Sequence, residues 1–484
     1  MNYRVVQRIL GFLLMVFSLT LVPPILVDFI YHENHWLDFL YPLILNLTVG
    51  LMLWYPSRHN RNELRVRDGF FISSMFWVVL SLVGSTPFQL TPELQLSFTD
   101  AVFEAMSGLT STGGTVIAGL DALPHGILFY RQQLNWLGGL GIVILAVAIL
   151  PMLGVGGMQL YKAEATGPTK DDKIAPRIAE TARYLWLVYV WLTVACTGML
   201  WLGGMTLFDA IGYSFAIMSL GGLAPHDASM GFYNTPYLVL TAGFFTLIAG
   251  INFTLHFSAW RGFSLKNYWA SPEVRLYLLI VAFSTLLIGL TLWQHDVYTD
   301  LTDALIAAFF NMVSVMTTNG LATTDLSAWP LFIPVFLIML SFIGASSGST
   351  AGGIKVVRIL LLWKQGVREL YLLVHPNAVV PIKLGAKTVS DKIISSVWAF
   401  FVMYIFTSVI ITLLLMATGL DFISAFATTA ACINNMGLGL GGTVTSNFSV
   451  LTDSATWIAT FAMLLGRLEL FTLLVLFTRA FWRG

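Results

Sequence analysis

The sequence predicts an all-α polytopic membrane protein with ten transmembrane helices and four helix–pore loop–helix repeats around a central pore. Three observations predict this fold: an excess of apolar residues, ten long apolar stretches and a motif that occurs four times. Of the 484 residues, 57% are hydrophobic and 10% are charged, against about 45–50% and about 25% in soluble domains. Lipid must therefore form part of the solvent. This excludes a cytosolic enzyme, a secreted domain and a disordered chain.

Ten stretches are long and apolar enough to cross a bilayer, which takes about 20 residues. They cover residues 9–30, 37–56, 70–88, 132–158, 184–205, 236–260, 276–294, 330–362, 394–418 and 455–480. Stretches longer than about 25 residues are expected to tilt, kink or break. The first stretch follows Arg4 and Arg8, as in a signal peptide, but no small-x-small cleavage site comes after it. We therefore interpret it as a retained helix.

The basic residues lie almost entirely on one side of this topology. All but two of the 25 Lys and Arg residues fall on the side of the termini, the exceptions being Arg131 and Arg467. The positive-inside rule makes that side cytoplasmic. About 15 acidic residues fall on the outer side, Asp28, Glu104 and Asp209 among them. We interpret them as a negative vestibule that concentrates cations; a solvated acidic rim without a role is the alternative.

A short motif that begins with Asp occurs four times after the first two stretches: Asp100-Ala-Val, Asp209-Ala-Ile, Asp303-Ala-Leu and, more loosely, Asp421-Phe-Ile. Each motif opens a semi-apolar segment of about 10–14 residues, which suits a re-entrant half-helix because it is too short to cross a bilayer. Asp is a favoured N-cap, so we expect each to cap a half-helix that starts at the outer surface. The predicted units are two N-terminal helices, residues 1–68, and four pore repeats, residues 69–165, 166–265, 266–375 and 376–484.

Small, polar or glycine-rich residues follow each half-helix, and they should lie at membrane depth. Irregular backbone survives there only inside protein or along a wet cavity, and its carbonyl oxygens can replace the water around a dehydrated cation. One such segment would be interpreted as an ordinary outer loop, but four in register favour a pore. The candidate cation ligands are the backbone carbonyls of Ser111, Thr112, Gly113, Leu220, Gly221, Gly222, Thr318, Asn319, Gly320, Asn435, Met436 and Gly437. Leu220 makes the symmetry imperfect, because the other loops carry Ser, Thr or Asn at that position.

Residues 344–353 interrupt the eighth stretch with Gly, Ala, Ser and Thr alone. They cannot form a stable helix against lipid, because each Gly costs about 1 kcal/mol. We predict a flexible polar loop across the conduction path; a close-packed helix crossing is the alternative. The candidate gating residues of this loop are Gly344, Ala345, Ser346, Ser347, Gly348, Ser349, Thr350, Ala351, Gly352 and Gly353.

Arg467 is the other candidate gating residue, because it lies inside the last apolar stretch. An intramembrane Arg costs at least roughly 2.5–3.5 kcal/mol unless it faces a cavity or a partner. Glu469 is two residues away and points to a different helix face, so a local salt bridge is not expected. We predict that Arg467 forms an electrostatic barrier to cations or holds the 344–353 loop. Snorkelling to the inner headgroups is the alternative.

No enzymatic or nucleotide-binding motif is complete in this sequence. The segment Gly348–Gly353 is followed by Ile354 where a P-loop requires Lys, and Gly437–Gly442 lacks the strand and acidic residue of a dinucleotide site. Cys196 and Cys432 have neither metal-ligand nor disulfide spacing. We expect a protein that is not an enzyme and binds no nucleic acid.

The order and spacing of these features resemble the TrkH/KtrB superfamily of potassium transporters, and the two extra N-terminal helices resemble its bacterial TrkH branch. The segments 176–182, 375–378 and 466–469, with the apolar run after the last, carry further resemblance. The resemblance implies potassium ions in the loops and an intramembrane gate at residues 344–353. It also implies a homodimer in contact with membrane lipid, with a cytosolic nucleotide-binding TrkA-like regulatory subunit. The location would be the bacterial inner membrane, with both termini cytoplasmic.

Two properties of the predicted transport stay open at this point. The loops lack the TVGYG sequence of potassium channels, which predicts looser cation selectivity on glycine count alone. A proton- or sodium-coupled symporter is the alternative to a channel-like pathway. It would need an acidic residue near the membrane midplane, for which Glu469 is the candidate.

Overall fold

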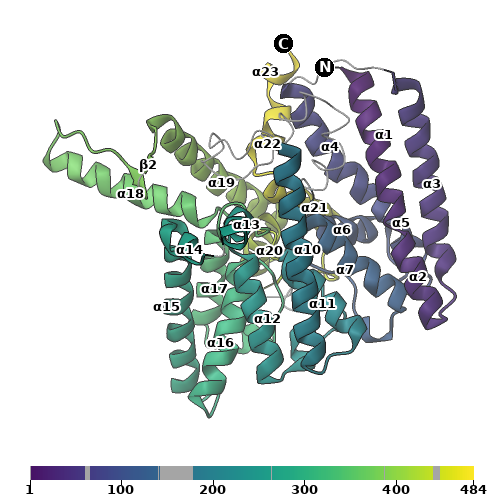
Figure 1. Ribbon diagram of the computed structural model, residues 1–484, viewed down its shortest axis with the longest axis horizontal. Helices are drawn as coiled ribbons and strands as arrows, with labels where there is room; N and C mark the ends of the chain where they lie inside the picture. The colour runs from purple at the N-terminus through teal and green to yellow at the C-terminus, as the bar shows by residue number, and fades with distance from the viewer. Residues whose placement is uncertain are drawn as a thin grey trace.

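The computed structural model describes residues 2–59, 66–139, 141, 178–262, 264–385, 387–439 and 447–483, and its regular structure is helical apart from one small hairpin. The first elements of the chain are α1 (Tyr3–Leu19), α2 (Val22–Tyr31), α3 (Trp36–Trp54), η1 (Tyr55–Ser57), α4 (Val66–Gly84) and α5 (Thr86–Leu90). The strands β1 (Lys383–Leu384) and β2 (Lys387–Thr388) pair antiparallel. The N-terminus and the C-terminus of the described chain lie at the same end of the molecule (Figure 1).

Helices α1 and α3 pack side by side at one flank of the molecule (Figure 1). Gly11 and Gly50 face each other across this contact, since a Cβ on either would lie 2.8 Å from the other's carbonyl oxygen. Small residues permit such close approach of helices in a membrane. The pair is therefore closely packed along these two helices.

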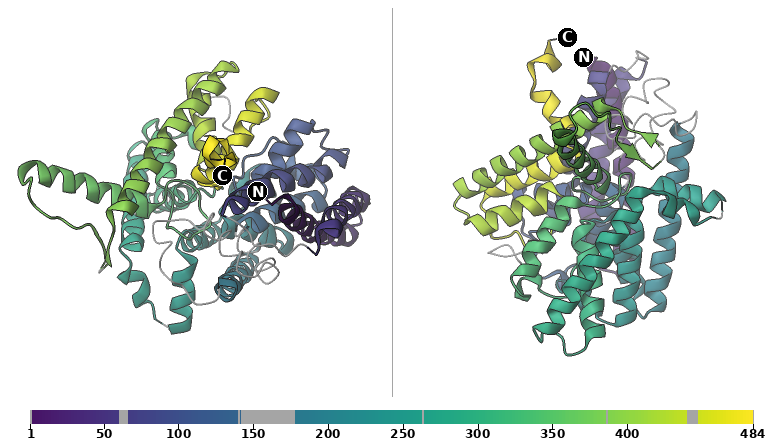
Figure 2. Two further views of the ribbon diagram at one scale, coloured as in Figure 1. Left: turned by 90° about the horizontal axis from the view of Figure 1, so that it is seen from above. Right: turned by 90° about the vertical axis from the view of Figure 1, so that its left-hand side faces the viewer.

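Four short helices correspond to the predicted half-helices: α6 (Phe98–Leu109), α11 (Leu207–Ser219), α16 (Leu301–Met316) and α20 (Phe422–Ile433). They contain 12, 13, 16 and 12 residues, so all are too short to span a bilayer. The helices that follow them are α7 (His125–Gly139), α12 (Pro236–Ala249), α17 (Phe332–Ile343) and α21 (Asp453–Arg467). Each of these four packs against the half-helix before it and the half-helix of the next repeat, so that α21 returns to α6. The contacts form a closed ring. Figure 2 shows the helices from above.

The predicted Asp N-caps are wrong for three of the four half-helices. Ser97, Thr206 and Asp300 cap α6, α11 and α16, and the motif Asp lies three residues later in the first turn. The hydroxyl of Ser97 donates to Asp100 (2.8 Å) and accepts from its backbone N–H (3.1 Å). The acid therefore supports the Ser97 cap by accepting from its hydroxyl, and is not the cap itself. Asp421 alone among the four motif residues is itself the N-cap.

Six helices in the described residues are long and apolar enough to span a membrane, or eight if each of two bent pairs is one span. They include α10 (Ile178–Leu202), α15 (Pro272–Gln294) and α19 (Asp391–Ala417). The bent pairs fall in the expected stretches 236–260 and 455–480: α12 with α13 (Phe253–Gly262) at 96°, and α21 with the segment Phe471–Phe477 at 106°. Most of the stretch 132–158 lies outside the described residues.

The stretch 330–362 is interrupted rather than one continuous helix: α17 ends at Ile343, and α18 (Val356–Val374) runs sideways out of the helix body (Figure 1). The ten glycine, alanine, serine and threonine residues between them supply too little helix propensity to keep one axis. The remaining short elements are η2 (Leu120–Ala122), η4 (Ser229–Tyr233), α14 (Lys266–Ala270), η5 (Leu326–Ala328), α22 (Phe471–Leu474), η7 (Val475–Phe477) and α23 (Arg479–Trp482).

Candidate ion-conduction site

The four loops after the half-helices meet head to tail in a closed ring. A Cβ on Gly113 would overlap the carbonyl oxygen of Gly221 in the next loop. In the same way, Gly222 meets the carbonyl of Asn319, Gly320 that of Met436, and Gly437 that of Thr112. Each contacted carbonyl belongs to the residue just before the next loop's glycine. The structure therefore brings all twelve candidate ligands together around one centre.

The same backbone conformation occurs in each loop. Gly113, Gly222, Gly320 and Gly437 have φ between 70° and 82°, and the residue two positions earlier has φ between 53° and 63°. The N–H of the residue before each glycine donates to a carbonyl in the last turns of its own half-helix: Thr112 to Ser107, Gly221 to Ala216, Asn319 to Ser314 and Met436 to Ala431. These are the bonds of a helix C-terminal Schellman motif. They use the loop donors and leave the loop carbonyls for the centre.

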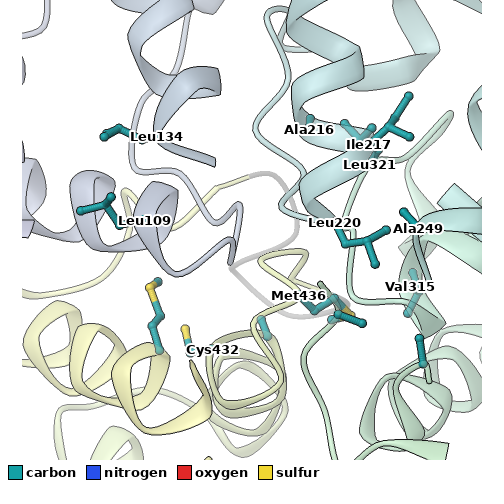
Figure 3. Close-up of a cluster of buried hydrophobic side chains, with 14 of the residues drawn as sticks. Leu109, Leu134, Ala216, Ile217, Leu220, Ala249, Val315, Leu321, Cys432 and Met436 are labelled. Atoms are coloured by element: carbon teal, nitrogen blue, oxygen red, sulfur yellow. The ribbon is translucent and has the colours of Figure 1, made fainter. Parts of the chain in front are cut away.

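The carbonyl oxygens at the centre accept no hydrogen bond from the part of the chain that the structure describes. This holds for Thr112, Gly221, Asn319 and Met436. The half-helices also aim their C-terminal ends, each equivalent to about half a negative charge, toward this centre. Figure 3 shows the apolar side chains that support the loops, including Leu109, Leu220, Val315 and Cys432. The arrangement can coordinate a dehydrated cation with oxygen alone.

The loop at residues 344–353 lies directly against the third and fourth loops of the ring and the last turn of α11. The Thr350 hydroxyl donates to the Met218 carbonyl (3.1 Å), and the Gly352 N–H donates to the Thr318 hydroxyl (2.7 Å). A Cβ on Gly352 would overlap the Asn434 carbonyl. This loop therefore covers one end of the ring, and most of its residues are buried.

Arg467 contacts the loop and the remaining repeat at once. Its guanidinium donates to the carbonyls of Thr350 (3.3 Å), Gly138 and Gly139 (3.1 Å). The side chain lies 5.5 Å above the Trp77 ring. Carbonyls of α7 and of the loop thus surround the guanidinium.

Four charged residues lie around the loop, and the sequence predicts none of their contacts. Glu469 pairs with Arg358 at 2.7 Å, although the residues are far apart in sequence. Glu273, in the first turn of α15, accepts a hydrogen bond from the Ser347 N–H at 2.6 Å. The sequence signal that could have identified Glu273 is an acidic residue at the start of an apolar span. Lys355 and Arg358, which were assigned to the cytoplasmic surface, are buried.

The predicted acidic vestibule is partly wrong. Glu104 and Arg131 are fully buried and pair at 2.8 Å. Asp28 and Asp209 are also buried; Asp209 accepts a hydrogen bond from the Tyr233 hydroxyl at 2.6 Å, and burial raises the pKa of Tyr233. Hydropathy places an acid on the outer side but does not distinguish a solvated carboxylate from a paired one. Asp121, Asp227, Asp303 and Asp325 are exposed.

Comparison with known proteins identifies the family of the chain that forms this ring. The family model for TrkH, a cation transport protein, matches residues 37–483. The chain belongs to the TrkH family. The match confirms the resemblance, the predicted all-helical membrane fold and the class of transporter rather than enzyme.

Relatives of this TrkH-family chain match it over its full length. The Trk system potassium uptake protein TrkH of Escherichia coli strain K12 is 50% identical over 483 residues, which is 100% of both chains. The TrkG protein of the same strain is 43% identical and covers 100% of this chain and 99% of its own. The crystal structure of the potassium transporter TrkH from Vibrio parahaemolyticus superimposes with a TM-score of 0.91 at 47% identity, covering 100% of both chains.

Proposed function

We propose that this chain takes up potassium ions through the ring of loops, which acts as a gated selectivity filter. The single observation that supports the proposal most strongly is the head-to-tail contact of the four loops. Potassium would be bound by the backbone carbonyls of residues 111–113, 220–222, 318–320 and 435–437. Carbonyl dipoles replace the hydration shell of a large monovalent cation at little cost, whereas a continuous apolar path would not. The names of the relatives support potassium as the ion.

The loop at residues 344–353 and Arg467 would form the gate of this pathway. The loop covers one end of the ring, and Arg467 places a positive charge beside it. A cation leaving the ring would have to displace the loop and pass the guanidinium, which raises an electrostatic barrier. Movement of the loop away from Met218, Thr318 and Asn434 would open the path.

The charge distribution and the relatives support a proposal for the membrane, the orientation and the partners. We place the protein in a bacterial inner membrane with both termini cytoplasmic, as a homodimer that works with a nucleotide-binding TrkA-like subunit. Two N-terminal helices would precede four pore repeats with the boundaries given above. Lys364, Arg368, Lys383 and Lys387 lie along α18 and the β hairpin, where they could contact acidic lipid headgroups or the regulatory subunit.

Flux through the purified protein in sealed vesicles tests this function. With a potassium gradient and no pH gradient, the current should reverse at the potassium Nernst potential. Vesicles without protein give the background. A current that requires a proton or sodium gradient would indicate the coupled symporter instead, and absence of potassium flux would contradict the proposal.

A further inference from the structure

In the first three half-helices, one position supports the segment that leaves the ring. Nine residues before the four loop glycines stand Glu104, Tyr213, Asn311 and Thr428, all with polar groups and all buried. Asn311 exchanges hydrogen bonds with Thr323, through its Nδ2 (2.7 Å) and its Oδ1 (3.0 Å). Tyr213 donates to the Ser229 carbonyl at 2.5 Å. The position therefore connects a half-helix with the chain beyond its loop.

Glu104 makes the same connection in the first repeat, and adds a charge. Its carboxylate accepts from the Thr115 hydroxyl (3.0 Å) and the Val116 N–H (3.1 Å). Arg131 Nε donates to the same carboxylate at 2.8 Å, and Arg131 Nη2 donates to the Thr115 hydroxyl at 3.0 Å. Both charged side chains are 0% exposed. A buried ion pair is an expensive way to join two segments, because both ions lose their water.

A comparison of the junctions between repeats shows what this charge adds. Two residues beyond a loop glycine, the Thr115 carbonyl accepts from the Phe448 N–H of repeat 4 (2.8 Å), and the Ala322 carbonyl accepts from the Gly231 N–H of repeat 2 (3.2 Å). The equivalent carbonyl in repeat 2 is that of Ala224, and its donor is Arg131 Nη1 at 3.3 Å. A side chain thus takes the place of a main-chain donor at the junction of repeats 1 and 2.

We propose that the Glu104–Arg131 pair is a positioning element that fixes the separation of the first two loops and thereby the discrimination between cations. Glu104 holds the segment after Gly113, and Arg131 holds the segment after Gly222. Bare carbonyls repel one another, so their spacing around an ion depends on lateral support of this kind. The inference rests on the proposed function, because it concerns the selectivity of that ring.

The test replaces the pair without leaving a buried charge. In E104Q/R131M, Gln keeps hydrogen bonds to residues 115 and 116 while Met fills the volume of the Arg stem. Replacing both partners of a buried pair is often tolerated, whereas removing one is not. We expect potassium flux in vesicles to persist and the potassium-to-sodium permeability ratio to fall about tenfold, which corresponds to about 1.4 kcal/mol of lost discrimination.

A second variant and a matched control keep this test decisive. R131K retains the charge balance, but one ammonium cannot replace a planar guanidinium at three partners, so it should also lower the ratio. If the E104Q/R131M protein does not accumulate in cells, the permeability ratio of the R131K variant alone tests the proposal. R358M/E469Q removes a second, partly buried pair, which has no hydrogen bond to the first two loops, and should keep the wild-type ratio whatever it does to total flux.

The outcomes separate this inference from the proposed function. If E104Q/R131M and R131K both fold and keep the wild-type permeability ratio, the pair does not position the filter. If the wild-type protein itself carries no potassium-selective flux, the proposed function fails. A potassium-specific increase in melting temperature, as expected for a bound ion, should disappear in parallel with the ratio.

Discussion

The ring of loops and the 344–353 loop touch each other, yet they are held in different ways. Each loop of the ring is bonded through its own main chain to its half-helix and rests against the next loop's backbone. The 344–353 loop has two main-chain hydrogen bonds to the α12–α13 junction, at Gly250 and Phe253. Its other anchors are single side chains from elsewhere in the chain: Thr318, Glu273 and Arg467. Main-chain contacts in a close-packed ring cannot change one at a time, whereas single side-chain contacts can.

This difference indicates that the 344–353 loop can move more easily than the ring. Opening the ring would break four Schellman motifs together. Moving the 344–353 loop breaks only a few hydrogen bonds, each worth about 0.5–1.5 kcal/mol net, or about 1.5–3 kcal/mol where one partner is charged. Substitutions in the ring should therefore abolish transport. Substitutions that remove a contact of the 344–353 loop should raise it.

Gly222→Ala should have the largest effect. Positive φ costs Ala about 1–2 kcal/mol, and its Cβ would overlap the Asn319 carbonyl. Because the carbonyls must shift, we expect potassium flux in vesicles to fall by about a hundredfold or more. Gly119→Ala is the matched control, since Gly119 has φ +76° with no atom within 4 Å of its added Cβ. Equal fluxes in both variants would contradict a rigid ring.

Arg467→Gln should have the next largest effect, in the opposite direction. It removes a positive charge and the donors to Thr350, Gly138 and Gly139. Hydrogen bonds to a charged group contribute about 1.5–3 kcal/mol, so flux should rise about tenfold. Arg479→Gln removes an exposed charge at the chain end and should leave flux unchanged. A flux in the Arg467→Gln variant at or below the wild-type value would rule out the barrier.

Glu273→Ala should raise flux by a smaller factor, about threefold, because it removes one hydrogen bond to the loop. The carboxylate that holds the Ser347 N–H is lost, so the loop should leave the ring more often. Asp391→Ala is the control: it is also an acid in the first turn of a spanning helix, but it pairs with Arg368.

Thiol labelling of an introduced cysteine checks the same change without a flux measurement. Cys196 and Cys432 are buried, so Ser349→Cys should be the main reactive thiol. The Glu273→Ala background should increase its labelling rate. Unchanged labelling together with unchanged flux would show that Glu273 does not hold the loop.

The ring could be predicted from the sequence because its information is local. Each loop needs a half-helix, a glycine with positive φ and polar neighbours, and these lie within about 20 residues of one another. The fourfold repetition then indicates that the loops belong together; its marks are Gly113, Gly222, Gly320 and Gly437. The 344–353 loop and Arg467 were found for a similar reason, since their composition conflicts with a lipid-facing helix.

The partners of these elements could not be predicted, because they come from other repeats. Arg131 and Ala224, or Glu273 and Ser347, meet only once the ring has closed. Hydropathy counted Glu104 as an outer acid because its half-helix enters from that side, yet the chain beyond the loop folds back over it. The sideways turn of α18 likewise depends on where the 344–353 loop is held rather than on local helix propensity.

Asp421 tests the outer end of the fourth half-helix, where we expect the smallest effect. Its carboxylate accepts from the N–H groups of Ile423 and Ser424, both at 3.1 Å. Hydrogen bonds from Ser424 hold the pKa of Asp421 below its usual range. A group whose pKa is lowered on folding contributes stability above its unfolded pKa, near 3.9 for Asp, and loses it as pH falls through the folded value.

Asp421→Ala should therefore lower the melting temperature slightly at pH 7, by about 2 °C or less, and by progressively less below about pH 4. Asp421→Asn keeps a good N-cap and removes the titration, so it should lose the acid dependence while keeping most of the stability. Asp453→Ala, in the first turn of α21 behind the N-cap Thr452, is the control for loss of an exposed acid. A melting-temperature difference that persists unchanged at about pH 3 would show that the ionised Asp421 does not stabilise this half-helix, and the ring would then depend on its loops alone.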